Sequence, residues 1–212
     1  MVSKRKTFTV YRVFIHCKII KRYNHKGKGE LTMKSEFKLI RRLKWEEVFL
    51  FWYLNEGENP SWQKLAMERG FASWAEWRLC GYADRFDCMN ADWGLYQIDK
   101  PAEVIAGMYG GPFRTWIEKY YGGEVTKKFV ELAEMSEIVA IPTIQAMKNN
   151  FPDSKVITVL TVGGKNFVIE GMHRSCALAL MNHEGRELDK PLILAIGKSK
   201  LEFLPTVGRN TA

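Results

Sequence analysis

The chain has 212 residues, of which 46% are hydrophobic and 26% are charged, so it can bury a substantial core. No apolar run approaches the roughly 20 residues that cross a bilayer, and the basic start lacks the apolar stretch and cleavage site of a signal peptide. The four scattered cysteines lack Cys-x-x-Cys spacing, which argues against a zinc site or a disulfide framework. We therefore expect a cytoplasmic protein with no membrane segment.

Positive charge is concentrated at the N-terminus. Residues 1–44 contain 14 Lys or Arg against two Glu, a net charge of +12, whereas residues 45–212 carry 18 against 22, a net charge of −4. A basic arm of this kind can contact nucleic acid or anionic lipid. Two other interpretations of residues 1–35 stay open. One is a disordered tail; the other takes Met33 as the natural start and places residues 1–32 outside the native protein.

Residues 36–92 are predicted to form a helical, Trp-rich extension. Apolar side chains in Glu36–Asn55 recur at roughly helical spacing. Ser61–Arg69 is predicted to be a short helix that ends at Gly70.

A further helix is expected to begin at Ser73, because Ser73 and Glu76 match a capping box. Five tryptophans lie between Trp45 and Trp77. Such a cluster could stack a base or another ring. Packing between short helices is the commoner use of tryptophan clusters.

Short helices and turns are predicted to follow within residues 93–198. A Gly-Gly-Pro turn precedes a helix over Arg114–Tyr121, and Lys127–Glu134 and Thr143–Asn149 are expected to be helical.

A β-hairpin is predicted next. Val156–Val162 is a β-branched run, and Asn166–Ile169 is its expected partner strand. The Gly163-Gly164 pair between them suits a two-residue turn, because both turn positions require positive φ.

The hairpin leads through Gly171 into a helix. Cys176–Met181 is apolar on nearly every side, which indicates burial, and Gly185 suits the end of the helix. Pro191–Ile196 is predicted to be the last strand, and residues 199–212 form a C-terminal tail.

The junction at Gly171 has the chemistry of an anion site. A glycine turn that feeds a helix N-terminus exposes free main-chain N–H groups at the positive end of the helix dipole. His173 and Arg174 fall in the first helical turn, where both can donate to phosphate. The alternative is that they only cap a surface loop.

The segment Glu170-Gly171-Met172-His173-Arg174, placed after a hairpin and before a small-residue helix, resembles the nucleotide-binding signature of the ParB/sulfiredoxin superfamily. Members carry Gly-Gly-Cys-His-Arg or Asp-Gly-His-His-Arg at this place. The resemblance implies an α/β fold over residues 93–198, with a small mixed sheet and flanking helices. It also implies that nucleotide phosphates are held by Gly171, Met172, His173, Arg174 and Ser175.

Two differences from known members exclude particular branches of this superfamily. Met172 stands where sulfiredoxins carry their reactive cysteine, and a thioether cannot form a thiolate. Cys176 is expected to be a buried core thiol. The sixteen residues after Ile196 are too few for the DNA-binding domain that follows in partitioning proteins.

The branch that fits best resembles small-molecule kinases, which carry an essential Glu in a Pro-x-Glu setting after their first strand. Glu103 occupies a similar setting. The implied reaction is Mg²⁺-dependent phosphate transfer from ATP or ADP to a small hydroxyl acceptor, with Glu170, His173 and Glu103 as catalytic candidates and no protein metal ligands. The alternative is that Glu103 is a solvated helix residue. A non-catalytic nucleotide sensor and a nucleic-acid-binding protein using residues 1–44 are the alternatives.

Overall fold

The structure is a computed structural model, and it describes residues 37–153 and 155–209. The described residues belong to one compact unit. The predicted basic arm, residues 1–35, lies outside the described residues. Met33, the alternative natural start, and Cys17 lie outside them too. The hypotheses about that arm therefore stay predictions.

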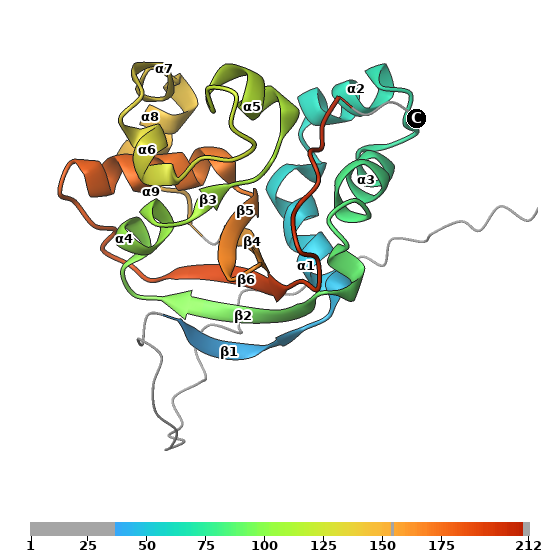
Figure 1. Cartoon of the computed structure of the whole chain (residues 1–212), viewed down its shortest axis with the longest axis horizontal. Helices are drawn as coiled ribbons and strands as arrows, with labels where there is room; N and C mark the ends of the chain where they lie inside the picture. The colour runs from blue at the N-terminus through green and yellow to red at the C-terminus, as the bar shows by residue number, and fades with distance from the viewer. Residues whose placement is uncertain (1–36, 154, 210–212) are drawn as a thin grey trace, which may run out of the picture. The chain divides into compact units, whose positions relative to one another are not determined.

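A six-stranded mixed sheet forms the centre of the described chain (Figure 1). Its strands are β1 (Lys38–Leu43), β2 (Asp92–Ile98), β3 (Tyr109–Gly110), β4 (Ile157–Val162), β5 (Lys165–Glu170) and β6 (Leu192–Lys198). The spatial order is β1-β2-β6-β4-β5-β3, with parallel pairing only for β4 with β6 and β3 with β5. The expected α/β class is confirmed.

Helices lie on both sides of this sheet. Helices α1, α2 and α3 lie to one side of it in Figure 1, and α4 to α9 lie to the other. The α-helices are α1 (Trp45–Trp52), α2 (Pro60–Glu68), α3 (Trp74–Arg78), α4 (Pro101–Ala106), α5 (Arg114–Lys119), α6 (Phe129–Ala133), α7 (Ser136–Val139), α8 (Pro142–Asn149) and α9 (Met172–His183). In the part of the chain that the structure describes, no helix has the length and apolarity needed to cross a bilayer.

Two hydrophobic cores follow from the alternation of side chains along the strands. In β4, Ile157 and Val159 pack into the core that contains α9, whereas Leu160 and Val162 pack into the core that contains the tryptophans. Helix α9 is the centre of the first core, and nine of its twelve residues are buried. The predicted burial of this helix is confirmed.

The prediction of one helix over Glu36–Asn55 is wrong in its first half. Residues Lys38–Leu43 form strand β1, which pairs antiparallel with β2 at the edge of the sheet. Only Leu43 of this strand reaches the core, while Leu39 and Ile40 are exposed. The apolar spacing suggested a helix, but pairing with a distant strand decides the conformation. The segment of residues 36–92 therefore contributes a strand to the same sheet.

The tryptophans pack helices against the sheet, as the commoner interpretation predicts. Trp52, Trp74 and Trp77 are almost completely buried. The Trp52 indole Nε1 donates to Thr158 Oγ1 at 2.9 Å, which ties α1 to β4. Since buried aromatic side chains contribute the most area to a core, this cluster stabilises the α1–α3 side of the sheet.

The other local predictions in this region are confirmed. Gly70 ends α2 at a φ of 85°. Ser73 Oγ accepts from the Glu76 N–H at 3.1 Å, while the Glu76 carboxylate accepts from the Ala72 N–H, one residue before the N-cap. The helices predicted around α5, α6 and α8 are present. The C-terminal segment also packs on the body, since Val207 is buried and its N–H donates to the Pro112 carbonyl.

Candidate functional site

The predicted hairpin that leads to the site is present. Gly163 and Gly164 have φ values of 55° and 75°, as a two-residue turn of this type requires. Their neighbours Val162 and Lys165 pair across the turn. Strand β5 then runs away from the turn and ends at Glu170, directly before the candidate site.

Gly171 connects β5 to α9 and must be a glycine for two reasons. Its φ of 100° lies in a region that L side chains rarely adopt. A Cβ at this position would also lie 3.1 Å from both Arg174 Nη2 and Ile157 Cγ1. The backbone of this turn therefore passes close to the Arg174 guanidinium and to Ile157.

The start of α9 has the properties of an anion-binding helix terminus. The helix has twelve residues, and no side chain caps its first turn. The first N–H groups of such a helix lack intrahelical acceptors and lie at the positive end of the dipole. Both features favour an anion at this end of the helix.

His173 is the exposed side chain of this first turn. Its ring lies 5.7 Å from the ring of Trp116 on α5. Although the imidazole reaches the surface, the protein around it partly desolvates the ring, which lowers the pKa of His173 below its usual value. The neutral imidazole that results at pH 7 still offers one N–H donor.

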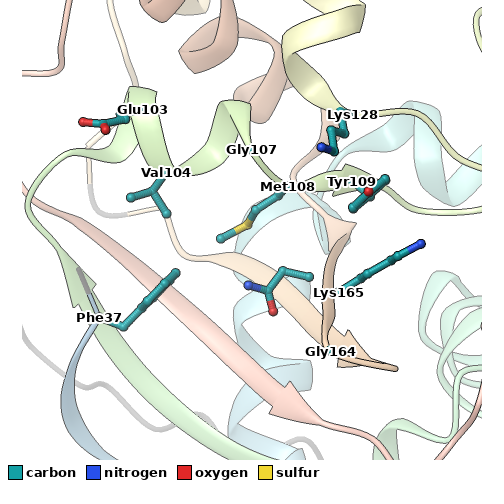
Figure 2. Close-up of a pocket in the computed structure, with 10 residues that line it drawn as sticks. Phe37, Glu103, Val104, Gly107, Met108, Tyr109, Lys128, Gly164 and Lys165 are labelled. Carbon is teal, nitrogen blue, oxygen red and sulfur yellow. The ribbon is translucent and has the colours of Figure 1, made fainter. Parts of the chain in front are cut away.

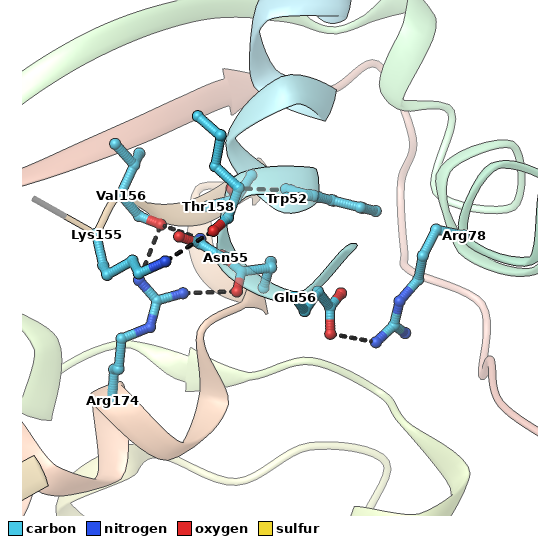
Figure 3. A network of polar contacts seen from close by, with 10 residues as sticks. Trp52, Asn55, Glu56, Arg78, Lys155, Val156, Thr158 and Arg174 are labelled. Atoms are coloured by element: carbon cyan, nitrogen blue, oxygen red, sulfur yellow. Dashed lines mark hydrogen bonds and ion pairs between the residues drawn. The ribbon is translucent and has the colours of Figure 1, made fainter. Parts of the chain in front are cut away.

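Arg174, in contrast, is committed to its own chain. Its Nη2 donates to Glu170 Oε1 at 2.6 Å, and its Nη1 donates to the Val156 carbonyl at 3.1 Å. Asn55 Nδ2 donates to the same carbonyl and to the other Glu170 oxygen. Figure 3 shows Arg174 and Asn55 converging on Val156. With exposed fractions of 7% and 10%, the Arg174 and Glu170 side chains form a buried ion pair.

A second buried ion pair lies beside the first. Arg78 Nη2 donates to Glu56 Oε2 at 2.7 Å, and both side chains are nearly buried (Figure 3). Burial raises the pKa of Glu56, Arg78 opposes that increase, and the negative charge of Glu170 adds to it. The Arg78 guanidinium also lies over the rings of Trp62, Trp77 and Tyr82, at 4.3 to 5.1 Å from their centroids.

Sequence reasoning missed this second pair and Asn55. Asn55 is 115 residues from Glu170, and Glu56 is 22 residues from Arg78. The segment Asn55-Glu56-Gly57 reads only as the end of a helix. No periodicity or motif links it to the Gly171 turn, so only the folded chain brings these groups together.

The remaining predicted phosphate-site residues point inward. Met172 and Ser175 are buried, and among the described residues Ser175 Oγ has no hydrogen-bond partner. Cys176 is completely buried and burial raises the pKa of its thiol, which confirms its prediction as a core residue. Met172 and Ser175 can therefore contact a ligand mainly through their main-chain groups.

Glu103 does not join the other candidates. It is an exposed residue of α4 that pairs with Lys100 at 3.3 Å, as the solvated-helix alternative predicts. It lines a pocket together with Gly164–Asn166, at the turn end of β5. Glu170 ends the same strand, five residues after Lys165 and about 16 Å from it at the usual rise per residue. The two candidate bases therefore belong to different places on the molecule.

Within residues 37–153 and 155–209, no group of three or more His, Cys, Asp or Glu side chains is arranged to hold a metal ion. No family model matches this chain, and no curated protein or solved structure matches it.

Proposed function

We propose that the start of α9 binds the phosphates of a nucleotide such as ATP or ADP. The observation that carries the proposal is the left-handed Gly171, which leads a strand into a twelve-residue helix without a side-chain cap. The exposed imidazole of His173 stands beside these free donors. The resemblance of Glu170–Arg174 to the ParB/sulfiredoxin nucleotide-binding signature supports the same assignment.

The residues of the turn have distinct roles in this proposal. The main-chain N–H groups of Met172–Arg174 and the imidazole N–H of His173 donate to phosphate oxygens. Arg174 positions the turn, because its guanidinium already donates to Glu170 and to the Val156 carbonyl. Mg²⁺ would arrive with the nucleotide, since Mg²⁺ usually binds through phosphates and keeps several waters.

A sensing role fits this geometry better than catalysis. Phosphoryl transfer needs a base that reaches the acceptor hydroxyl. Both oxygens of Glu170 already accept hydrogen bonds, and Glu103 lies near the opposite end of β5. We therefore propose a nucleotide-binding module whose bound state is read by a partner.

Phosphate transfer to a small hydroxyl acceptor is the second candidate. The observation that favours it is a second carboxylate, Glu56, whose pKa is raised by burial. Glu56 directly follows Asn55, whose Nδ2 donates to Glu170 Oε2 at 2.9 Å, so it lies near Glu170.

The binding test is calorimetry with ATP, ADP and inorganic phosphate, with and without Mg²⁺. His173→Ala removes one donor to a charged acceptor and should weaken nucleotide binding about tenfold. His183→Ala, at the last turn of the same helix, is the matched control and should leave affinity unchanged. Absence of nucleotide binding by the wild type, or equal losses in both variants, would contradict the proposal.

Transfer of radiolabelled phosphate to a pool of hydroxyl metabolites separates the two candidates. Tight nucleotide binding without phosphate transfer to any acceptor would support the sensing role. Transfer that Glu56→Gln or Glu170→Gln reduces about a hundredfold, with nucleotide affinity retained, establishes the phosphotransferase.

A further inference from the structure

A second candidate site lies at the turn end of β5. An open pocket of about 380 Å³ lies between α4, the start of β3 and the hairpin turn (Figure 2). Phe37, Val104 and Met108 supply its apolar part, and Tyr109, Lys128 and Lys165 supply an aromatic ring and two cations. We call it the hairpin pocket.

The two lysines of the hairpin pocket gather around one aromatic ring. Lys128 Nζ lies 5.6 Å from the Tyr109 ring centroid, and Lys165 Nζ lies 5.4 Å from it. Neither ammonium group forms an ion pair with a carboxylate of the described chain. Glu103, which also lines the pocket, pairs with Lys100. Because both ammonium groups lie at the same ring, an anion beside Tyr109 is attracted by both.

These groups are positioned by regular structure. Tyr109 is in β3, which pairs with β5 so that Tyr109 lies opposite Phe167, and the two rings are 5.5 Å apart. Lys165 is the first residue of β5, and Lys128 directly precedes α6. Three segments distant in sequence therefore present their polar groups to one pocket, as sites built on rigid elements do.

We propose that the hairpin pocket binds a small organic anion, with an aromatic or apolar body and a phosphate or carboxylate head. Its volume is near the lower end of the usual range for small-molecule sites, about 300–1,000 Å³. The apolar part accommodates the body of the ligand beside Tyr109. Lys128 and Lys165 bind the head as two point charges.

This pocket is distinct from the nucleotide site proposed at α9. The length of β5, about 16 Å, separates Lys165 from Glu170. Reacting groups must approach to about 3–3.5 Å. A ligand in the hairpin pocket therefore cannot receive phosphate directly from a nucleotide bound at Gly171, and the pocket is a binding site in its own right.

The test uses four probes and the main-chain amide shifts of the isotope-labelled full chain. Phenyl phosphate and benzoate have both body and head, inorganic phosphate lacks the body, and phenol lacks the charge. At least one of the first two should bind saturably and shift the amides of Tyr109, Lys128 and Lys165. Phenol and inorganic phosphate should bind at least tenfold more weakly. The tighter of phenyl phosphate and benzoate identifies the head group.

Variants then locate the binding. Lys128→Gln combined with Lys165→Gln should weaken the preferred probe at least tenfold, and both side chains are exposed, so the fold is retained. Lys64→Gln, at a lysine that is 79% exposed on α2, is the matched control. His173→Ala should also leave the affinity unchanged. No saturable shift, an undiminished affinity in the double variant, or a loss in His173→Ala would overturn the proposal.

Discussion

The basic side chains at the two ends of β5 differ in burial and in pairing. At the Glu170 end, Arg174 is buried and its guanidinium binds a carboxylate and a carbonyl of the same chain. At the Lys165 end, Lys165 and Lys128 are exposed, and no carboxylate of the described residues pairs with them. A basic residue within a binding motif is therefore not by itself free to bind a ligand. Lys128 and Lys165, which belong to no motif, have no carboxylate partner in the described chain.

Burial explains the difference. A charge that is removed from water must be paired, because its desolvation costs several kcal/mol. An exposed ammonium group keeps its hydration and gains little from a partner. The Arg174–Glu170 pair therefore supports the turn, and the lysines of the hairpin pocket leave the fold largely unaffected.

The largest effect is expected from Arg174→Ala. The substitution leaves the nearly buried Glu170 carboxylate without its cation and removes a donor from the Val156 carbonyl. The free energy of unfolding should fall by about 3–5 kcal/mol, measured by urea denaturation. Lys165→Ala, the matched change at the other end, should stay within about 0.5 kcal/mol of wild type.

A double variant separates the pair from the packing around it. Arg174→Met with Glu170→Leu removes both charges and should recover most of the stability that Arg174→Ala loses. Similar stability losses in Arg174→Ala and Lys165→Ala would mean that the two ends of β5 do not differ in this way.

The glycines at the two ends provide the second comparison. Gly171→Ala adds a Cβ at a φ of 100° and in close contact with Ile157, so it should cost about 2–3 kcal/mol. Gly164→Ala pays only for its positive φ, because nothing lies within 4 Å of the added Cβ, and should cost about 1 kcal/mol. Thermal unfolding of both variants measures the difference, and an equal cost would show that the contact with Ile157 relaxes freely.

A smaller effect is expected from pH at the buried end. The pKa of Glu56 is raised in the folded state by burial, so the folded protein binds this proton more tightly than the unfolded chain does. The contribution of Glu56 to the free energy of unfolding therefore falls as pH rises from about 4.5 through the folded pKa. Glu56→Gln should remove this slope from urea denaturation series between pH 4 and pH 8. Lys165→Gln should leave it in place, and an unchanged slope in Glu56→Gln would refute the assignment.

The smallest effect concerns His173. Its pKa is lowered by partial desolvation, so its contribution to stability is present above the unfolded value of about 6.5 and is lost as pH falls below it. Trp116→Ala exposes the ring and should move its titration, followed by the imidazole proton resonance, back toward the usual value. A His173 midpoint that Trp116→Ala leaves unchanged would assign the desolvation to other groups.

Local constraints account for what could be predicted of the site. The hairpin, the Gly171 turn and the burial of α9 depend on the φ of single glycines and on short apolar runs. The helix start at Ser73 likewise depends on groups three residues apart. Such features are visible in sequence because the interacting residues are neighbours in the chain.

Features that depend on distant partners were missed or mistaken. Strand β1 forms because its edge pairs with β2, where Lys38 lies opposite Gln97. Sequence spacing alone predicted a helix for those residues. Glu103 was one of the catalytic candidates, but only the fold shows that it lies at the turn end of β5 while Glu170 ends the same strand.

The sequence by itself determined the Gly171 turn, its twelve-residue helix and the charges beside it, because steric limits on φ and short-range hydrogen bonds act within a few residues. Only the tertiary structure decided which basic side chains of the described residues are paired within the protein and which are left without a carboxylate partner. Asn55 reaches Glu170 across 115 residues and helps to hold it against Arg174, while Lys128 and Lys165 meet at Tyr109 from separate segments. Burial and pairing are properties of the packed chain, and they separate a structural cation from one that can bind a ligand.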